Sequence, residues 1–398
     1  MNEKNLPKRM CMVVHSYYPS DARVKRESEL LVRNGVAVDV LCLRNKSEIK
    51  RENVGGVNVT RLGVRRHRGA PVLIYLLEYF MFISYASFIL AVRCIRNRYE
   101  VLQFHNPPDY IVFAGFFPKL LGVKIVLDMH EIVPELFMNR WGLEEGSMVV
   151  WVTKWLEKIS IALSNKVMTV SDPVKEVIES RTGRKNITIV MNVADDALFR
   201  PVGRGGHLRP DLTLISYHGI VAPWYNISSV IRAISRLSAN GRKIRFDVFG
   251  DGPDFETLNT MVRSSRLSPI VFLHGMLPIE DIKREVEQSD IGVVPLVNRK
   301  YYADLAMPTK LLELAALGIP AIVPRLPIIE RYFDDAMVQY YDADDEDDLR
   351  KKLEELVINC DLRASISSNV KKFSNRYSWE NQGKAYLEML EDLARGRT

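Results

Sequence analysis

The segment MPTKLLELAALGIPAIVP, residues 307–324, places a lysine and a glutamate where they could bind a nucleotide. Pro308 begins a helix, Lys310 falls in its first turn, and Glu313 lies three residues further along on the same face. The positive helix end and the lysine could bind a diphosphate, and the carboxylate could accept both hydroxyls of a ribose. The alternative is a surface ion pair. A lysine in the first turn opposes the helix dipole, which favours the ligand role.

Two glycines in the same half of the chain could allow a ligand to approach the backbone. Gly250 and Gly252 lie between a strand-like run, IRFDVF, and a helix that begins at Phe255. The alternative is that they only make the turn. Neither a G-x-x-x-x-G-K-[ST] loop nor a complete G-x-G-x-x-G fingerprint occurs in the sequence, so these glycines alone identify no nucleotide.

Two histidines in the first half close short apolar runs. His105 ends VLQFH and His130 ends KIVLDMH, and Glu131 follows directly. An imidazole at such a position could hydrogen-bond a ligand hydroxyl or a departing phosphate, whereas the alternative is a loop histidine satisfied by backbone groups. The acidic run DADDEDD, residues 342–348, has D-x-D spacing suited to a metal, but we interpret it as the N-terminal cap of the following helix.

Alternating strand and helix patterns must position these residues. Repeated β-α units of this size predict parallel sheets with helices on both faces, and in such sheets ligands bind beyond the carboxyl ends of the strands. The pattern breaks near residues 200–211, which are rich in Gly, Pro and Arg, and then restarts. We therefore expect two facing Rossmann-like domains with a cleft between them, residues 1–200 and 201–377. A last helix, 378–398, belongs to the second domain or packs back on the first.

Composition and charge limit the partners. The four cysteines are far apart and suggest neither disulfides nor a zinc site, which fits a cytoplasmic setting, and the first apolar run is too short for a signal peptide. Residues 1–200 carry 29 Lys and Arg against 21 Asp and Glu, net +8, while residues 201–398 carry 26 against 28, net −2. A basic first half points to an anionic partner such as a membrane surface, unless the charges are scattered over solvated faces.

The longest apolar stretch, residues 72–92, has three interpretations: a helix buried in a domain, a helix lying in the membrane interface, or a span. It is long enough to cross a bilayer, but it contains Glu78 and has arginines on both sides, so no charge asymmetry orients a span.

The chain resembles glycosyltransferase family 4 enzymes of the GT-B fold. The resemblance lies in VPLVNRKYYADLAMPTKLLELAALGIPAIV, FDVFGDGPDFETL, IVFLHGMLPIEDI and MNVADDALF, and in SYYPSDARVKRESELLVRNGVAVDVL, FHNPPDY and VLDMHEIVPELF of the first half. Their succession covers nearly the whole chain. These segments are similar to a branch that glycosylates lipid-linked or surface polysaccharide precursors.

The resemblance implies roles for particular residues. In the second half, Glu313 matches the family's ribose-binding glutamate. The family's sugar-contacting glutamate falls on Leu305, so Asp304 is the candidate there. The family's phosphate-binding Arg and Lys are missing from HGIVAPWYN, which leaves Lys310, Arg299 and Lys300 as replacements, and the base would contact backbone near His274 and Gly275.

In the first half, the resemblance places His130 beside the donor sugar, and we take it as catalytic together with Glu131, which flanks the same loop and could face the acceptor. The candidates on the acceptor side are Arg23, Arg26, His105 and Asn106.

These implications define the expected function. A UDP- or GDP-sugar donates its sugar to a lipid-linked or glycan acceptor with retention, without a metal or other cofactor and without nucleic acid. The enzyme would be cytoplasmic and peripherally bound to the inner face of an anionic membrane. The alternatives are a sugar-nucleotide epimerase of the same fold and a non-catalytic membrane- or anion-binding protein with a degenerate transferase fold.

Overall fold

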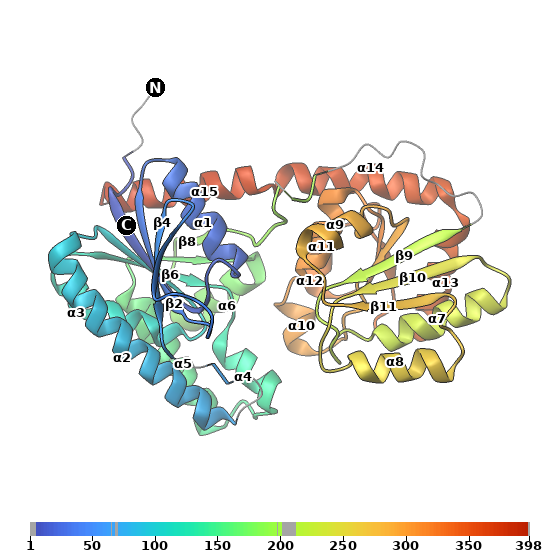
Figure 1. Cartoon of the computed structure of the whole chain (residues 1–398), viewed down its shortest axis with the longest axis horizontal. Coiled ribbons are helices and arrows are strands. Elements are labelled where there is room, and N and C mark those ends of the chain that lie inside the picture. Colours follow the sequence, from blue (N-terminus) through green and yellow to red (C-terminus); the bar gives the residue numbers. More distant parts are fainter. Residues whose placement is uncertain (1–4, 65, 68–70, 197, 201–211, 397–398) are drawn as a thin grey trace. The chain divides into compact units, whose positions relative to one another are not determined.

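The computed structural model describes residues 5–64, 66–67, 71–196, 198–200 and 212–396, which form two compact α/β units (Figure 1). Unit 1 comprises Met1–Asn192 and Gln382–Thr398, and unit 2 comprises Val193–Asn381. The first unit therefore ends at Asn192, before the expected boundary at residue 200. The expected linker, 200–211, lies outside the described residues except for Arg200.

The sheet of unit 1 has the strand order β3-β4-β2-β1-β5-β6-β7-β8 among the described residues. Its strands are β1 (Arg9–Tyr17), β2 (Ala37–Leu43), β3 (Arg51–Val54), β4 (Val57–Leu62), β5 (Val101–His105), β6 (Lys124–Met129), β7 (Lys166–Thr169) and β8 (Ile187–Ile189). Neighbouring strands are parallel except for β3 and β4. The antiparallel hairpin was not predicted, although its turn, Gly55-Gly56, has φ angles of 59° and 90° that favour glycine.

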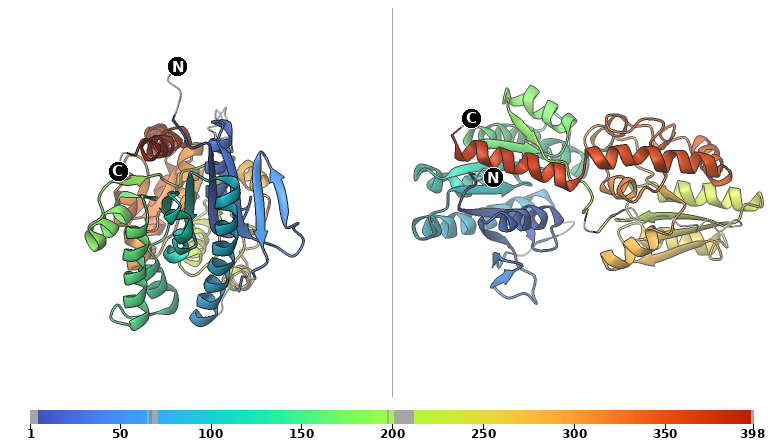
Figure 2. Two further views of the ribbon diagram at one scale, coloured as in Figure 1. Left: turned by 90° about the vertical axis from the view of Figure 1, so that its left-hand side faces the viewer. Right: turned by 90° about the horizontal axis from the view of Figure 1, so that it is seen from above.

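Helices cover both faces of this sheet (Figure 2). They are α1 (Ala22–Arg33), α2 (Val72–Asn97), η1 (Asp109–Gly115), α3 (Phe116–Leu120), α4 (Val133–Trp141), α5 (Met148–Leu163), α6 (Asp172–Thr182) and α15 (Trp379–Ala394). The segment after β5 begins as the tight 3₁₀ turn η1, which brings Gly115 so close to β5 that a Cβ atom there would lie 2.9 Å from the Phe104 ring.

Helix α2 is apolar on two sides. One side packs inward through side chains spaced three or four residues apart, namely Tyr75, Tyr79, Phe82, Ala86, Leu90 and Cys94. The other side leaves large apolar side chains in solvent, with Phe80 68% and Phe88 69% exposed. Glu78 does not interrupt the exposed side, because it is buried 3.1 Å from Nε2 of His15 and accepts the backbone N–H of His67 at 2.8 Å. The helix is long and apolar enough to cross a membrane by length and composition.

Unit 2 has a wholly parallel sheet among the described residues, in the order β11-β10-β9-β12-β13-β14. The strands are β9 (Thr213–His218), β10 (Ile244–Phe249), β11 (Val271–Gly275), β12 (Ile291–Val293), β13 (Ala321–Pro324) and β14 (Gln339–Tyr341). The helices are α7 (Ile227–Ala239), α8 (Phe255–Ser264), α9 (Ile279–Val286), α10 (Lys300–Asp304), α11 (Thr309–Leu317), α12 (Pro327–Glu330), α13 (Glu346–Ile358) and α14 (Cys360–Arg376). The core packs α7 and α13 against β9 and β10.

The acidic run and the last helix take defined places. Asp345 caps α13 by accepting the backbone N–H groups of Asp347 and Asp348 at 2.9 Å, as the cap interpretation predicts. The last helix, α15, joins unit 1 (Figure 2): the Tyr386 hydroxyl is buried and donates to Oε1 of Gln103 in β5 at 2.6 Å.

Candidate active-site residues

In unit 2, Lys310 is enclosed by aromatic rings at the start of α11. Its Nζ donates to the Tyr217 hydroxyl at 2.9 Å and lies 3.1 Å from the centroid of the Tyr225 ring. Only 5% of the residue is exposed, and burial holds the pKa of the amine well below its usual value, against the opposing charge of Glu313. A cation held against ring faces beside a helix N-terminus favours a ligand that supplies negative charge.

Glu313 faces the carboxyl end of β9, one turn beyond Lys310. Its Oε2 atom lies 2.6 Å from Nε2 of His218, the last residue of that strand, and its side chain is 21% exposed. The predicted pair on α11 is therefore not a surface ion pair between Lys310 and Glu313, since each side chain has its own partner on β9.

The two glycines after β10 are needed for close packing of two loops. A Cβ atom on Gly250 would lie 1.9 Å from the carbonyl oxygen of Gly219, and one on Gly252 would lie 2.3 Å from that of Val221. Their φ angles, 145° and 158°, also favour glycine. The room at both positions is filled by the loop after β9. The glycines shape that loop, and direct contact with a donor stays a prediction.

The remaining predicted donor residues lie at the end of β11 and at α10. His274, near the end of β11, pairs through Nε2 with Oδ1 of Asp247 at 2.7 Å, and Gly275 accepts the Gly250 N–H at 2.8 Å. Arg299 caps α10, which runs from Lys300 to Asp304. The segment before α10 contacts the loop after β9, because Val297 N–H donates to Trp224 O at 3.0 Å and Tyr302 stacks on Trp224.

In unit 1, two histidines share one carboxylate at the carboxyl end of the sheet. His105 Nδ1 lies 2.8 Å from Oδ2 of Asp128, and His130 Nε2 is hydrogen-bonded to the same oxygen. Burial by itself raises the pKa of Asp128, but the His130 charge and the hydrogen bonds from both histidines hold that pKa below its usual range. His105 is fully buried, so it can influence a ligand only through Asp128 and His130.

One ring nitrogen of His130, Nδ1, is buried without a hydrogen-bond partner among the described residues. The side chain as a whole is 7% exposed. Burial, followed by the charge of Arg23, lowers the pKa of His130, while burial and hydrogen bonding to Asp128 act in opposite directions on the pKa of His105 and leave it raised. The arrangement favours a neutral His130 held in one orientation by Asp128.

Asn106 fixes the loop that bears His130 and Glu131. Its Oδ1 atom accepts the backbone N–H groups of those residues at 2.6 and 3.2 Å, and its Nδ2 atom donates to Asp109 at 2.7 Å. Burial raises the pKa of Glu131 to about 7, opposed by the charge of Arg23. Asn106 therefore positions the candidate catalytic residues, whereas the sequence placed it on the acceptor side.

Of the two predicted arginines, only Arg23 lies near this cluster. Arg23 is in the first turn of α1 and binds Asp21 through two hydrogen bonds, of 2.9 and 2.8 Å. Arg26 is 8% exposed and donates to Oδ1 of Asn192 at 2.6 Å, which leaves it little surface for an acceptor.

One group in unit 1 has the donor atoms of a metal site. Ligand atoms of Glu27, His105, Asp128 and His130 all lie within 4.8 Å of one another. The hydrogen bonds from both imidazoles to one Asp128 oxygen, and the bond from Gln103 to Glu27 at 2.6 Å, already account for most of these atoms. The geometry fits a hydrogen-bonded cluster that shares protons at least as well as it fits a site with a bound cation.

Sequence reasoning missed Asp128, His218 and Tyr225. A signal existed for Asp128, because it lies two residues before His130 and so on the same face of a strand. His218 ends β9 and meets Glu313 of another element, and Tyr225 lies in the loop after β9, so no local pattern indicates either contact.

Comparison with known families identifies the class. Residues 206–373 match the sequence model of "Glycosyl transferases group 1", and residues 22–198 match that of "Glycosyltransferase Family 4". The fold is that of GT-B glycosyltransferases. Among solved structures, sucrose-phosphate synthase from Thermosynechococcus elongatus superposes with a TM-score of 0.75 at 13% identity, covering 98% of this chain and 100% of that one. Anabaena Alr3699/HepE in complex with UDP-glucose gives 0.70 at 13% identity, covering 96% and 99%.

The chain belongs to the family 4 type of GT-B glycosyltransferases, and it is a transferase rather than an epimerase or a non-catalytic protein. A curated relative is the phosphatidylinositol N-acetylglucosaminyltransferase GPI3 subunit of Saccharomyces cerevisiae. It is 21% identical over 350 residues, which are 84% of this chain and 74% of that protein.

Proposed function

We propose that this glycosyltransferase moves a sugar from a UDP- or GDP-sugar to a lipid-linked or surface polysaccharide precursor, with retention of configuration. The observation that carries the proposal is the placement of Lys310 and Glu313 on one turn of α11, each held by a side chain of β9. In a nucleoside diphosphate the phosphates are esterified to the 5′ oxygen of the ribose, so a cation and a carboxylate that bind the two groups must lie close together.

Unit 2 holds the donor in this proposal. The C–O bond between sugar and diphosphate breaks with its electron pair on the phosphate, so negative charge develops there. Lys310 and the N-terminus of α11 stabilise that charge, and Glu313 fixes the ribose. Arg299 and Lys300 add exposed cations from α10. Because Anabaena HepE was solved with UDP-glucose, a uridine donor is the first to test.

Unit 1 acts on the sugar and the acceptor. His130 accepts a hydrogen bond from a sugar hydroxyl at Nδ1, and Asp128 keeps the ring oriented. Glu131, with a pKa near 7, is available beside it as a hydrogen-bond donor or acceptor for the acceptor hydroxyl. No metal takes part in these steps.

The proposed location is the inner face of an anionic membrane, to which the enzyme binds peripherally. The net charge of +8 on residues 1–200 and the exposed apolar side of α2 support it. The name of the S. cerevisiae relative, which includes phosphatidylinositol, supports a lipid acceptor.

Donor binding and transfer are tested separately. Calorimetric titration of the purified enzyme with UDP, GDP and a panel of their sugars identifies the donor, and product linkage by NMR after transfer to a lipid-linked acceptor gives the stereochemistry. Binding of none of these nucleotides would overturn the proposal. Adding EDTA tests whether a metal takes part, and turnover should be unchanged. A loss of turnover that a divalent cation restores would assign that cation to the Glu27, His105, Asp128 and His130 group.

A further inference from the structure

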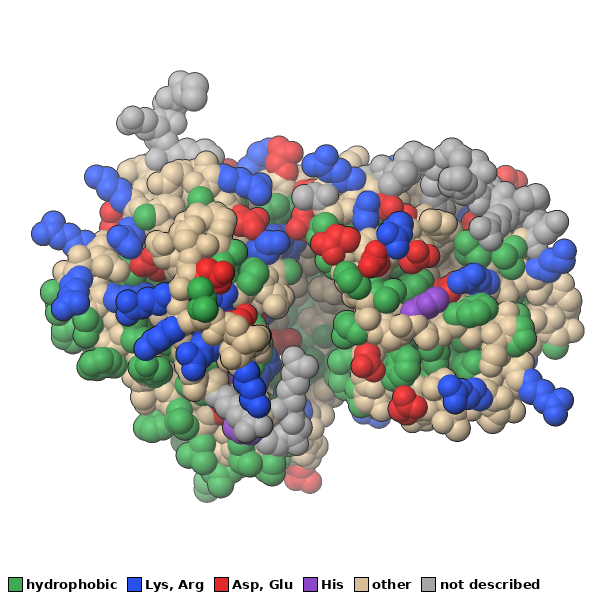
Figure 3. All heavy atoms as spheres, viewed as in Figure 1, with side chains coloured by type: hydrophobic (Ala, Val, Ile, Leu, Met, Phe, Trp, Pro, Cys, Tyr) green, Lys and Arg blue, Asp and Glu red, His purple; other side chains and the backbone are tan. Residues whose placement is uncertain are grey.

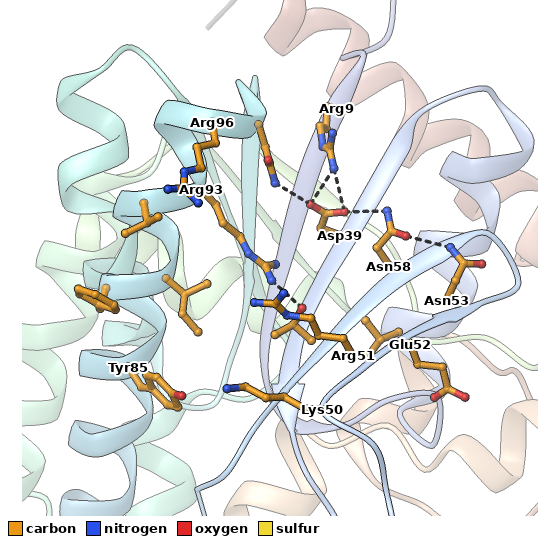
Figure 4. A pocket seen from close by; sticks show the side chains of 16 residues that line it. Arg9, Asp39, Lys50, Arg51, Glu52, Asn53, Asn58, Tyr85, Arg93 and Arg96 are labelled. Atoms are coloured by element: carbon orange, nitrogen blue, oxygen red, sulfur yellow. Dashed lines mark hydrogen bonds and ion pairs between the residues drawn. The ribbon is translucent and has the colours of Figure 1, made fainter.

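A cavity in unit 1 lies away from the candidate active-site residues. It has a volume of about 770 Å³ and lies between α2 and the β3–β4 hairpin (Figure 4). Arg9, at the start of β1, and Asp39, in β2, form part of its wall, whereas the His105, Asp128 and His130 cluster lies at the opposite, carboxyl ends of the strands. Along α2, Glu78 beside His15 and Arg93 in the cavity wall are 15 residues apart, roughly 22 Å at 1.5 Å per residue.

The polar wall of this cavity has an excess of positive charge. Its cations are Arg9, Lys50, Arg51, Arg93 and Arg96. The carboxylate of Asp39 is used internally, because it accepts from Arg9 at 3.2 Å and from Asn58 at 3.0 Å. Glu52 pairs with Arg61 at 2.8 Å. Among the described residues, Lys50, Arg51 and Arg96 have no carboxylate partner, and Arg93 donates only to the Thr60 hydroxyl, at 2.7 Å.

The opposite wall is apolar and continues out of the cavity. It is formed by Tyr85, Phe88, Ile89 and Val92 of α2, of which Phe88 is 69% exposed. Beyond the cavity, the same helix exposes 56% of Leu77 and 68% of Phe80. In the space-filling view, Lys and Arg side chains border apolar ones along this edge of unit 1 (Figure 3). An apolar surface of this extent beside a cationic pocket matches a ligand with an anionic head and hydrocarbon tails.

We propose that this cavity binds the phosphate headgroup of an anionic phospholipid, whose acyl chains lie along the exposed side of α2. The lipid is a membrane anchor and not the acceptor, because three strands of the sheet, β2, β1 and β5, separate the cavity wall on β4 from β6, the strand that ends beside His130. Lys50, Arg51, Arg93 and Arg96 bind the phosphate, and the exposed side chains of Phe80, Tyr85 and Phe88 contact the chains. The inference rests on the proposed membrane location, but not on the transfer reaction.

The test compares variants of the full-length enzyme in co-sedimentation with phosphatidylcholine vesicles that contain phosphatidic acid. The double variant Arg51→Gln/Arg96→Gln should bind roughly 30-fold more weakly, from about 1 kcal/mol for each basic residue. The control, Lys25→Gln/Arg33→Gln on α1, removes the same charge from exposed positions outside the cavity and should change binding less than about threefold. Equal losses of vesicle binding in the two double variants would indicate a diffuse electrostatic attraction and would overturn the proposed lipid site.

A second experiment distinguishes a lipid from a soluble phosphate as the occupant of the cavity. Phe88→Ser should weaken vesicle binding and leave binding of glycerol phosphate unchanged; unchanged vesicle binding would overturn the lipid as occupant. Uridine nucleotide binding should be the same in all these variants. Absence of nucleotide binding in the wild-type enzyme would contradict the proposed reaction and leave the lipid result standing.

Discussion

His218 Nε2 lies 2.6 Å from Glu313 Oε2, although the two residues are 95 positions apart in the sequence. The bond joins the end of β9 to the second turn of α11 and leaves Glu313 facing the loop after β9. A carboxylate fixed by a strand-end histidine needs no reorientation to accept the hydroxyls of a ribose, so its binding energy is not spent on ordering the side chain.

Glu313→Gln should weaken binding of the nucleotide while the fold survives. Loss of charge-assisted hydrogen bonds to two hydroxyls costs about 1.5–3 kcal/mol, or roughly a tenfold to hundredfold increase in Kd. Calorimetry with UDP and GDP measures it, and Glu354→Gln on α13 is the matched control. His218→Ala should give a smaller loss that His218→Gln partly restores. Wild-type affinity in Glu313→Gln would exclude the ribose role.

Lys310→Met should weaken binding of a nucleoside diphosphate far more than that of the nucleoside. Methionine keeps most of the buried volume between Tyr217 and Tyr225, so the fold loses little packing, while the cation is removed. Comparing UDP with uridine isolates the phosphate contribution. Equal losses for the two ligands would show that Lys310 only supports the loop.

Local patterns were enough to predict most of the fold, because buried strands and amphipathic helices have different periodicities and the caps at Ser171 and Asp345 are short-range features. The partners of the site residues were not predictable in this way. His105 and Asp128 meet because β5 and β6 align in register, and His218 meets Glu313 across two elements. Such contacts depend on strand order and register, which no single segment encodes.

His130→Ala should reduce turnover more than donor affinity. The ring is oriented by Asp128 and accepts at Nδ1 from a sugar hydroxyl, and such hydrogen bonds strengthen at the transition state. Steady-state kinetics with a lipid-linked acceptor, alongside donor titration, separates kcat from Kd. Asp128→Asn should also reduce turnover, but by less than His130→Ala does, since the His130 ring remains and loses only its orientation. An unchanged kcat in His130→Ala would make the histidine structural.

Glu131 should make stability depend on pH. Its pKa is about 7 in the folded protein against an ordinary 4.5, so the folded state keeps a proton that the unfolded state has released between these values. The stability that this proton contributes is complete below pH 4.5 and is lost as pH rises through 7. Glu131→Gln removes the dependence, so its Tm relative to wild type should rise from pH 5 to pH 8. A constant Tm difference across that range would contradict the raised pKa.

The exposed side of α2 predicts the character of the proposed membrane binding. The buried stripe through Phe82, Ala86 and Leu90 belongs to the core of unit 1, which argues against a span, and the exposed leucines and phenylalanines argue against an ordinary core helix. Arg66, and the neighbouring Arg65 and Arg68 outside the described residues, add charge at its start. Binding to anionic vesicles should therefore have an electrostatic part, which high salt or replacement of these arginines by Gln removes, and an apolar part, which salt leaves intact.

Leu73→Ser/Phe80→Ser should abolish the salt-resistant fraction, because burying each such side chain contributes about 1.5–3 kcal/mol. The control is Met276→Ser/Ile358→Ser, which removes exposed apolar side chains from unit 2 and should leave sedimentation unchanged. If the wild-type enzyme stays in the supernatant with anionic vesicles at low salt, α2 only completes the core. If detergent alone releases both the wild type and the double variant, the helix enters the bilayer more deeply than an interfacial position allows.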